Sequence, residues 1–136
     1  MMTELRVGPN TLHIKINPET EASGLFAFES VFPPGGMMPY LHFHRAQEEA
    51  FYVLDGVIEY TRGTETIAAP VGTMVHIPAG IHHKFRNLSQ DSPARHLAFI
   101  SPGIDGLNMM RDMATIDFRD LQAVMGACLR HNSALV

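Results

Sequence analysis

The sequence predicts an all-β fold with an α-helix packed on it near the end of the chain. Turn segments rich in proline and glycine recur along most of the 136 residues. The short segments between them alternate apolar and polar residues, as half-buried β-strands do. Only the last part of the chain changes to apolar residues at steps of three and four, which is typical of an amphipathic helix. The length fits one domain rather than two.

The strands are predicted from the turns that separate them, because proline and glycine at these places favour turns over helices. The turns are expected at 33–36, 55–56, 62–63, 70–72, 78–80 and 101–103. The strands are expected at 12–16, 25–32, 51–54, 57–61, 73–77 and 96–100. The residues around His42 and His44, and the segment that begins at His83, are interpreted as strands too. Many short strands at regular spacing favour a sandwich or a barrel.

The helix is predicted from Asp117 onward. Its apolar stripe consists of Phe118, Leu121, Val124, Met125, Cys128 and Leu129. Asp117 is the expected N-cap, with Asp120 three residues further on, where a carboxylate stabilises the start of a helix. A shorter helix is expected over 107–113. Cys128 lies on the stripe, so we expect a buried structural thiol.

Composition excludes several classes of function. Ten Lys and Arg face 14 Asp and Glu, for a net charge of -4, and no basic run occurs, so a nucleic-acid partner is not expected. No apolar stretch approaches the length of a membrane span. The first residues lack the apolar core of a secretory signal, so a cytoplasmic location is expected. The single Cys128 excludes a disulfide framework or a cysteine-built zinc site.

The histidines supply the strongest functional signal. His42 and His44 are two residues apart and share one face of a strand. Glu49 follows at a distance that suits a hairpin to the next strand, and His83 comes 34 residues later. Three imidazoles and a carboxylate suit one divalent transition metal: iron, manganese, nickel, copper or zinc. A single histidine is more often an ordinary residue with one hydrogen bond, so the spacing alone leaves both interpretations open.

The same residues stand in two motifs that resemble those of the cupin superfamily. The first motif is matched by Gly36, His42, His44, Glu49 and Gly56. The second motif is matched by Gly72, Pro78, Gly80, His83 and Asn87. The resemblance implies one domain over 1–136, with a jelly-roll barrel of two antiparallel sheets over about 10–101 and a helical tail over about 104–131. It also implies that His42, His44, Glu49 and His83 bind one metal ion inside the barrel.

Strand alternation extends the inner face outward from these ligands. The predicted pocket residues are Met38, Tyr40, Phe51, Val53, Ile81 and Phe85. This lining is apolar and aromatic, and no Lys or Arg is expected to point inward. A phosphosugar would require such a cation. A small enol, diketone, phenol or flavonoid requires only the metal and apolar walls.

The remaining polar candidates are interpreted as surface residues with one exception. Those expected to face solvent are His13, His76, His82, His131 and Glu48. His131 also suits the C-terminal end of a helix. The alternation pattern does not assign His96 to either face, so its role stays open.

The outward faces of the ligand strands are unusually apolar. The residues concerned are Leu41, Phe43, Ala50, Tyr52 and Leu54. A solvent-exposed sheet face is normally more polar, so either the C-terminal helix or a partner subunit covers it. Small cupins are commonly dimers, and the resemblance therefore favours a homodimer.

Three functions follow from the resemblance. The leading hypothesis is a metal-dependent dioxygenase or related oxygenase, similar to the quercetinase-like small cupins, acting on a small enol, phenol or flavonoid with Glu49 as general base. The second is a non-redox isomerase, epimerase, lyase or decarboxylase that uses the metal as a Lewis acid. The third is a small-molecule binding protein without catalysis. A fold alone does not choose among them.

Overall fold

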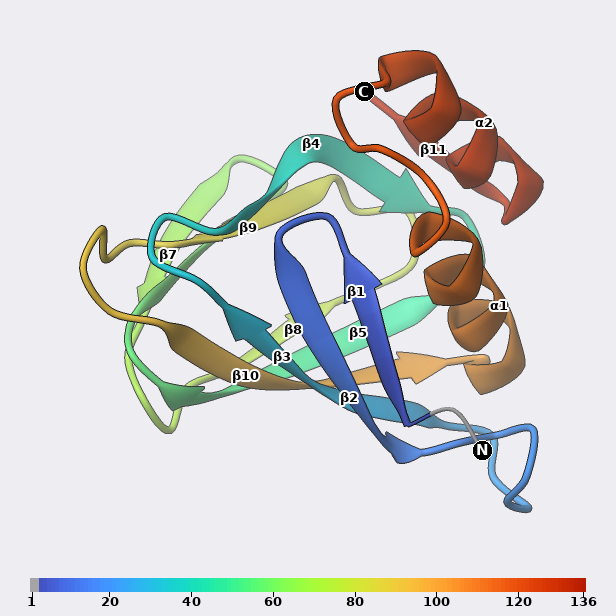
Figure 1. The fold of residues 1–136 in the computed structure, drawn as a ribbon, viewed down its shortest axis with the longest axis horizontal. Helices are drawn as coiled ribbons and strands as arrows, with labels where there is room; N and C mark the ends of the chain where they lie inside the picture. The colour runs from blue at the N-terminus through green and yellow to red at the C-terminus, as the bar shows by residue number, and fades with distance from the viewer. Residues whose placement is uncertain (1–2) are drawn as a thin grey trace.

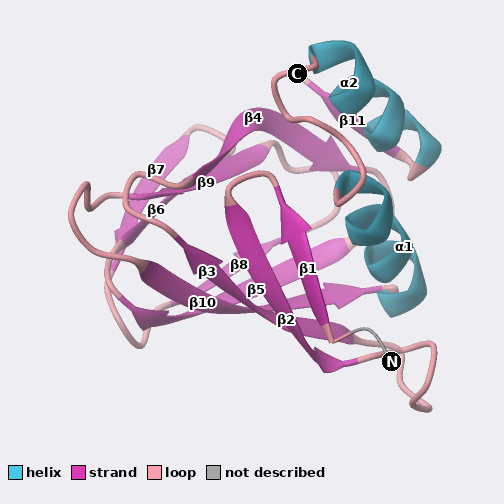
Figure 2. Cartoon of the chain, in the orientation of Figure 1, coloured by secondary structure: helices cyan, strands magenta, loops and turns pink. Residues whose placement is uncertain are grey.

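The protein was analysed as a computed structural model that describes residues 3–136. Within these residues the strands form two antiparallel sheets that face each other, and two helices near the end of the chain lie at one end of them (Figure 1). Figure 2 shows the predominance of strands. The predicted all-β jelly roll with a C-terminal helix is confirmed.

The two sheets differ in size and together contain all the strands of the described residues. The six-stranded sheet runs, in spatial order, β1 (Glu4–Val7), β2 (Asn10–Ile16), β3 (Phe26–Phe32), β10 (Ala94–Ser101), β5 (Glu48–Asp55) and β8 (Met74–Ile77). The five-stranded sheet runs β11 (Ser133–Leu135), β4 (Met37–His44), β9 (His83–Asn87), β6 (Ile58–Arg62) and β7 (Glu65–Ala69). Consecutive strands in the chain often belong to opposite sheets, so the inner faces of both sheets contribute to one core.

The core follows from strict alternation along the strands. On β10 every second residue is buried, and the buried set includes His96 and Ile100. The two sheets enclose apolar side chains that are almost inaccessible to solvent: Phe26, Phe28, Phe32, Phe51, Val53, Ile58 and Tyr60. Burial of large aromatic side chains is the main stabilising term for such a sandwich.

Three strands were not predicted from the sequence: β1, β7 and β11. Strand β11 has only three residues and directly follows a helix, so no period can be recognised in it. Strand β7 carries one buried residue, Ala69, and lies at the edge of its sheet. Strands β1 and β11 lie outside the segment 10–101, so the two sheets extend beyond the barrel boundaries expected from the sequence.

The helical tail consists of α1 (Gly103–Met113) and α2 (Leu121–Arg130). The expected start of the second helix at Asp117 is wrong. Asp120 is the N-cap, and its side chain accepts the N–H of Ala123 at 3.1 Å, whereas Asp117 accepts the backbone N–H of Arg119 in the preceding turn. No helix within residues 3–136 is long and apolar enough to cross a membrane.

The apolar stripe of α2 is only partly buried. Val124, Ala127 and Cys128 pack inward, which confirms the buried thiol. The same helix leaves three apolar side chains largely exposed: Leu121, Met125 and Leu129. The main contacts of α2 are with β11 and α1.

The apolar residues on the outer faces belong to two different sheets, which the sequence did not reveal. Strand β4, with Phe43, lies in the five-stranded sheet, and β5, with Tyr52, lies in the six-stranded sheet. The Phe43 ring is covered in part by the Arg45 guanidinium, 5.1 Å from its centroid, and by the His82 ring. Tyr52 is 37% exposed and pairs across the ladder with Met74, which is 54% exposed. The uncovered part of the outer surface is therefore the β5–β8 face.

The turns use the motif residues as backbone elements. Gly56 has a φ of 74°, and a Cβ there would lie 2.9 Å from the Cβ of Ala94, so only glycine fits. The Asn87 side chain donates to the carbonyl oxygens of Pro33 and Ser92 and accepts the N–H of Ser89. Asn87 thus fixes the loop behind the His83 strand, as its expected local backbone role requires.

Candidate metal centre

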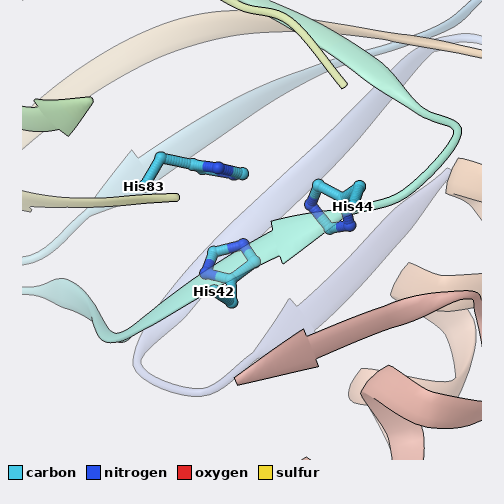
Figure 3. Close-up of side chains that lie close together, drawn as sticks. All are labelled: His42, His44 and His83. Carbon is cyan, nitrogen blue, oxygen red and sulfur yellow. The ribbon is translucent and has the colours of Figure 1, made fainter. Parts of the chain in front are cut away.

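Three histidines converge between the sheets. His42 and His44 project from β4 and His83 from the neighbouring β9, where His42 and His83 are partners in the ladder. Figure 3 shows the three imidazoles side by side. One ring nitrogen from each lies within 4.8 Å of the others, and all three residues are buried. The expected convergence of these three side chains is confirmed, and the cluster is consistent with a metal-ion site.

Hydrogen bonds fix the tautomers of His42 and His83. The Nδ1 of His42 lies 2.8 Å from the carbonyl oxygen of Tyr40, and the Nδ1 of His83 lies 2.9 Å from that of Ile81. A carbonyl oxygen only accepts, so each Nδ1 carries the proton. Each Nε2 consequently has a free lone pair directed at the centre. This arrangement, with one ring nitrogen anchored and the other free, is characteristic of metal-binding histidines.

His44 is anchored by a residue far away in the chain. Its Nδ1 lies 2.6 Å from Oγ of Ser133 on β11. The Ser133 hydroxyl donates to the carbonyl oxygen of His131 at 3.1 Å, so it accepts from the Nδ1–H of His44. Ser133 was not predicted as a site residue. It lies 89 residues from His44 in the chain, and the sequence around it contains no motif that indicates a hydrogen bond to a ligand.

Glu49 reaches the cluster from the opposite sheet. Its Oε1 lies 2.9 Å from Nε2 of His44 and its Oε2 lies 3.3 Å from Nε2 of His83. Neither Nε2 has a hydrogen bond of acceptable alignment, although both are fully buried. Lone pairs that face a carboxylate at such distances repel it unless a cation lies between them. The donor set therefore fits a divalent metal ion, with two types of ligand that transition metals accept.

Protonation at neutral pH suits metal binding at two of the four groups. Burial, together with the nearby His83 and His44, lowers the pKa of His42 to about 3, so His42 is neutral. Burial opposes the charge of Glu49, yet His44 and His83 hold the pKa of its carboxyl well below the usual value, so it is ionised. Burial also opposes a charge on His83, but Glu49 raises the pKa of His83. A proton on His83 therefore competes with the metal ion.

A small cavity of about 60 Å³ adjoins the cluster. His42, His44 and Glu49 form part of its wall. Its other lining residues are mostly apolar and include Phe32, Met38, Phe51, Phe85, Ile100, Met109, Met113 and Phe118. No Lys or Arg side chain of the described residues lines it, which agrees with the sequence analysis.

Six pocket residues were predicted, and three of them line this cavity: Met38, Phe51 and Phe85. The Tyr40 hydroxyl instead donates to the carbonyl oxygen of Phe118, because the ladder between β4 and β9 is irregular between Met38 and His42. Val53 is buried further along β5. Ile81 lies in the turn before β9, where strand alternation does not apply, and it faces a surface groove with His76.

Of the four histidines predicted to face solvent, His76 and His82 are exposed, whereas His13 and His131 are half-buried. His76 is exposed and pairs with Glu48 at 2.9 Å, and His131 caps the end of α2. His96 is buried on the cavity wall, and its Nδ1 lies 2.7 Å from the Tyr60 hydroxyl. Alternation along β10 places His96 on the same buried face as Ile100. The sequence around His96 did not indicate which face of the strand would be buried.

The profile of the cupin domain family matches residues 28–100, more than half of the chain. The chain belongs to the cupin family. The match spans every strand that contributes to the histidine cluster and Glu49, so the resemblance recognised in the two sequence motifs is confirmed.

A curated relative from Streptomyces coelicolor, itself uncharacterised, is 40% identical over 57 residues. That alignment covers 42% of this chain and 52% of the relative, so the chain spans about half of the relative's length. The name of the relative states neither a family nor an activity.

Several solved cupin structures share the fold at low identity. A predicted oxalate decarboxylase from Thermotoga maritima is 18% identical with a TM-score of 0.66, covering 74% of this chain and 92% of that one. A cupin-superfamily sugar phosphate isomerase from Silicibacter pomeroyi is 20% identical with a TM-score of 0.60, covering 68% and 59%. A cupin-2 domain protein from Rhodospirillum rubrum is 19% identical with a TM-score of 0.62, covering 70% and 61%. These likenesses show the fold alone.

Removal of a ligand histidine is expected to abolish stoichiometric metal binding. We predict that His42→Ala or His83→Ala reduces the metal content of purified protein to a small fraction of the wild-type value, because each deletes a converging Nε2 donor. Elemental analysis of protein purified without chelators measures this directly. His76→Ala, which deletes an exposed histidine, is the matched control. Unchanged metal content in the His42 and His83 variants would refute the ligand set.

Loss of the Ser133 hydroxyl is expected to weaken the metal site without deleting a ligand. Ser133→Ala leaves the Nδ1–H of His44 without its acceptor, and outer hydrogen-bond partners of this kind typically contribute about 10- to 100-fold in metal affinity. Competition titration with a chromophoric chelator measures the change. Ser92→Ala, at an exposed serine, is the control. Equal affinities of the two variants would show that Ser133 serves packing only.

Proposed function

We propose that this cupin is a metal-dependent oxygenase that acts on a short, uncharged, enolisable substrate. The observation that carries the proposal is the combination of Glu49 and three histidines with a small, mostly apolar cavity that lacks a cationic side chain among its lining residues. A carboxylate beside the metal ligands supplies a base, and the apolar walls exclude water. An uncharged substrate needs no Lys or Arg to neutralise it.

The size of the cavity narrows the substrate. About 60 Å³ accommodates roughly four to six water-sized atoms, whereas a cavity of roughly 150 Å³ is known to hold benzene. A flavonoid does not fit this cavity, and neither does a simple phenol. We therefore limit the proposed substrates to short enols. These keep the enol oxygen that the resemblance to quercetinase-like cupins leads us to expect in the substrate.

His42, His44, His83 and Glu49 would hold one divalent transition metal in the proposed mechanism. When bound, iron, manganese, nickel or copper supplies Lewis acidity and redox chemistry, and zinc supplies Lewis acidity only. Glu49 accepts the proton that the enolisable carbon or hydroxyl of the substrate releases, at whichever carboxylate oxygen faces the cavity. Phe51 and Phe85 hold the substrate against this base and keep bulk water away.

A non-redox reaction is the second candidate. It is supported by two structural neighbours, which are described as a sugar phosphate isomerase and a predicted oxalate decarboxylase. Glu49 could serve either reaction as the base. A phosphorylated or doubly anionic substrate would lie in this cavity without a cationic partner among the residues that line it. The non-redox alternative therefore also concerns an uncharged substrate.

Oxygen consumption tests the leading proposal. Metal-free protein is reconstituted separately with iron, manganese, nickel, copper and zinc, and oxygen uptake is recorded with short hydroxyketones and dicarbonyl compounds, with a flavonol as the size control. We expect uptake with at least one redox-active metal and none with the flavonol. At equal metal loading Glu49→Gln should lower the rate by about 10²- to 10⁴-fold, whereas Glu48→Gln should not change it.

Two results would contradict the oxygenase. The first is an absence of uptake with every metal bound. The second is conversion of substrate by the zinc form in the absence of oxygen, which would establish the non-redox reaction instead.

We also propose that the protein is a homodimer that buries the β5–β8 face. Tyr52 and Met74 are cross-strand neighbours on the uncovered outer surface, and Val71 in the adjoining turn is 61% exposed. A contiguous exposed apolar patch on a sheet is typical of an association surface.

Light scattering coupled to gel filtration is expected to give twice the chain mass of 15.1 kDa at micromolar concentration. Tyr52→Glu should produce the monomer, and Leu129→Glu on α2 should leave the dimer intact. A monomeric wild type, or dissociation by the Leu129 substitution alone, would overturn this interface.

A further inference from the structure

His96 is a buried polar residue that the metal centre does not use. It is 1% exposed and lines the same cavity as His42, His44 and Glu49. Its ring stacks on Phe51 with centroids 4.7 Å apart and meets Phe32 edge to face at 4.8 Å. The Nε2 atom is fully buried and has no hydrogen-bond partner within residues 3–136. An unpaired buried donor or acceptor is costly, so such an atom on a cavity wall points to a ligand.

Tyr60 determines which proton His96 carries. The Tyr60 hydroxyl lies 2.7 Å from Nδ1 of His96, and burial raises the pKa of Tyr60, so the hydroxyl retains its proton. If His96 donated through Nδ1, the hydroxyl proton would have no acceptor in the described structure. Tyr60 therefore donates to Nδ1, and the proton of the neutral ring is on Nε2. His96 presents an Nε2–H donor held by a hydrogen bond on its other side.

Two further polar residues, Ser30 and Asn10, line the cavity on the same sheet as His96. Ser30 on β3 is its direct partner in the ladder and is 4% exposed. Asn10 on β2 lies two residues before the ladder partner of Ser30, so it shares this face of the sheet. Its amide nitrogen is placed 3.4 Å from the carbonyl oxygen of Met37, which leaves Oδ1 buried and without a partner. We call Asn10, Ser30 and His96 the polar strip.

The polar strip and the metal centre lie on one cavity but at different levels. The His96 ring lies 5.3 Å from the ring of Phe85, which is two residues after His83 on β9. Two residues of a strand correspond to about 7 Å along its axis. A ligand that reached both sites would therefore extend along Phe85 and would need an oxygen function at each end.

The polar strip carries no charge. Burial lowers the pKa of His96 to about 3, with the Glu49 carboxylate opposing this shift, so the ring is neutral near pH 7. Asn10 and Ser30 are uncharged, and no Lys or Arg of the described residues lines the cavity. An anionic group placed here would lose its hydration without gaining a counter-charge. An uncharged carbonyl or hydroxyl oxygen would meet the Nε2–H donor of His96.

We propose that the polar strip binds the uncharged oxygen end of the substrate and that the Nε2–H of His96 donates to its carbonyl or hydroxyl oxygen. This inference rests on the proposed function, and it adds the substrate class: a short hydroxycarbonyl compound without a carboxylate. His96 contacts the substrate, Asn10 Oδ1 is available to accept a hydrogen bond from a substrate hydroxyl group, and Tyr60 is a positioning residue that acts through His96. The strip selects against carboxylates, and the metal centre binds the opposite end of the ligand.

A matched pair of probes tests the selection. 4-Hydroxybutan-2-one and 3-hydroxypropionate have nearly the same shape, but the second carries a carboxylate where the first has an acetyl group. Long-range ¹H–¹⁵N spectra of the zinc-loaded protein report the histidine tautomers and their perturbation. We expect His96 as the Nε2–H tautomer and a shift of its Nε2 resonance with 4-hydroxybutan-2-one only. A cationic ring, an Nδ1–H tautomer, an equal shift with both probes, or no shift with either would overturn the proposal, the last because the donor is then directed at the Phe32 ring.

Variants separate substrate contact from packing. His96→Phe should weaken the binding of 4-hydroxybutan-2-one about 10-fold, and His96→Gln, which restores a donor, should recover most of that loss. Tyr60→Phe should shift the tautomer of His96 toward Nδ1–H and weaken the same probe. The metal content of all three variants should equal that of the wild type. His82→Phe, at an exposed histidine, is the control. Equal affinity of the wild type and His96→Phe would refute the contact.

The binding measurements also keep this inference apart from the proposed function. Zinc-loaded protein that binds the hydroxyketone through His96, combined with an absence of oxygen uptake for every metal, would retain the polar strip and refute the oxygenase. Oxygen uptake by His96→Phe with the affinity and rate of the wild type would retain the oxygenase and refute the contact between His96 and the substrate.

Discussion

The burial of three imidazoles and a carboxylate is the constraint on which the rest of the site depends. Polar groups of this kind are stable between two apolar sheets only if each has a partner. The outer nitrogen of every ring has a hydrogen-bond partner in the backbone or in Ser133, whereas the buried inner nitrogens of His44 and His83 have none among the described residues. The hydrogen bonds of the outer nitrogens thus fix the tautomers of the three rings. They also direct the lone pairs of the inner nitrogens toward one space, where a cation would stabilise them.

Because each buried polar group needs a partner, residues that are distant in the chain must be positioned precisely relative to one another. His44 belongs to the first ligand strand, its hydrogen-bond acceptor Ser133 to β11, and Glu49 to the opposite sheet. Strand β11 pairs with β4 opposite the two histidines, so the helical tail is joined to the metal centre through this strand. The tail is therefore a part of the site as well as a cover for the apolar end of the barrel.

The sequence predicted those features that depend on local period and on motif spacing. The shared face of His42 and His44, the cation-free lining and the outward position of His76 follow from strand alternation. Alternation failed at Ile81, which lies in a turn, and at Tyr40, beside an irregular ladder. Ser133 and the Tyr60–His96 pair could not be predicted, because each contact joins strands whose relative register is determined only in the folded structure.

The solved neighbours share the fold of this protein, and a fold alone does not determine the chemistry of its site. The neighbours share two sheets and a barrel, but specificity depends on the side chains that close the cavity. Here Met109, Met113 and Phe118 from the helical tail meet the aromatic wall, and they leave a space of about 60 Å³. The tail therefore helps to set the size of the cavity, no Lys or Arg of the described residues lines it, and His96 contributes an uncharged imidazole to its wall. A cupin with the same candidate metal ligands but an arginine on this wall would select a different class of substrate, since charge complementarity in a cavity between two sheets outweighs similarity of the fold.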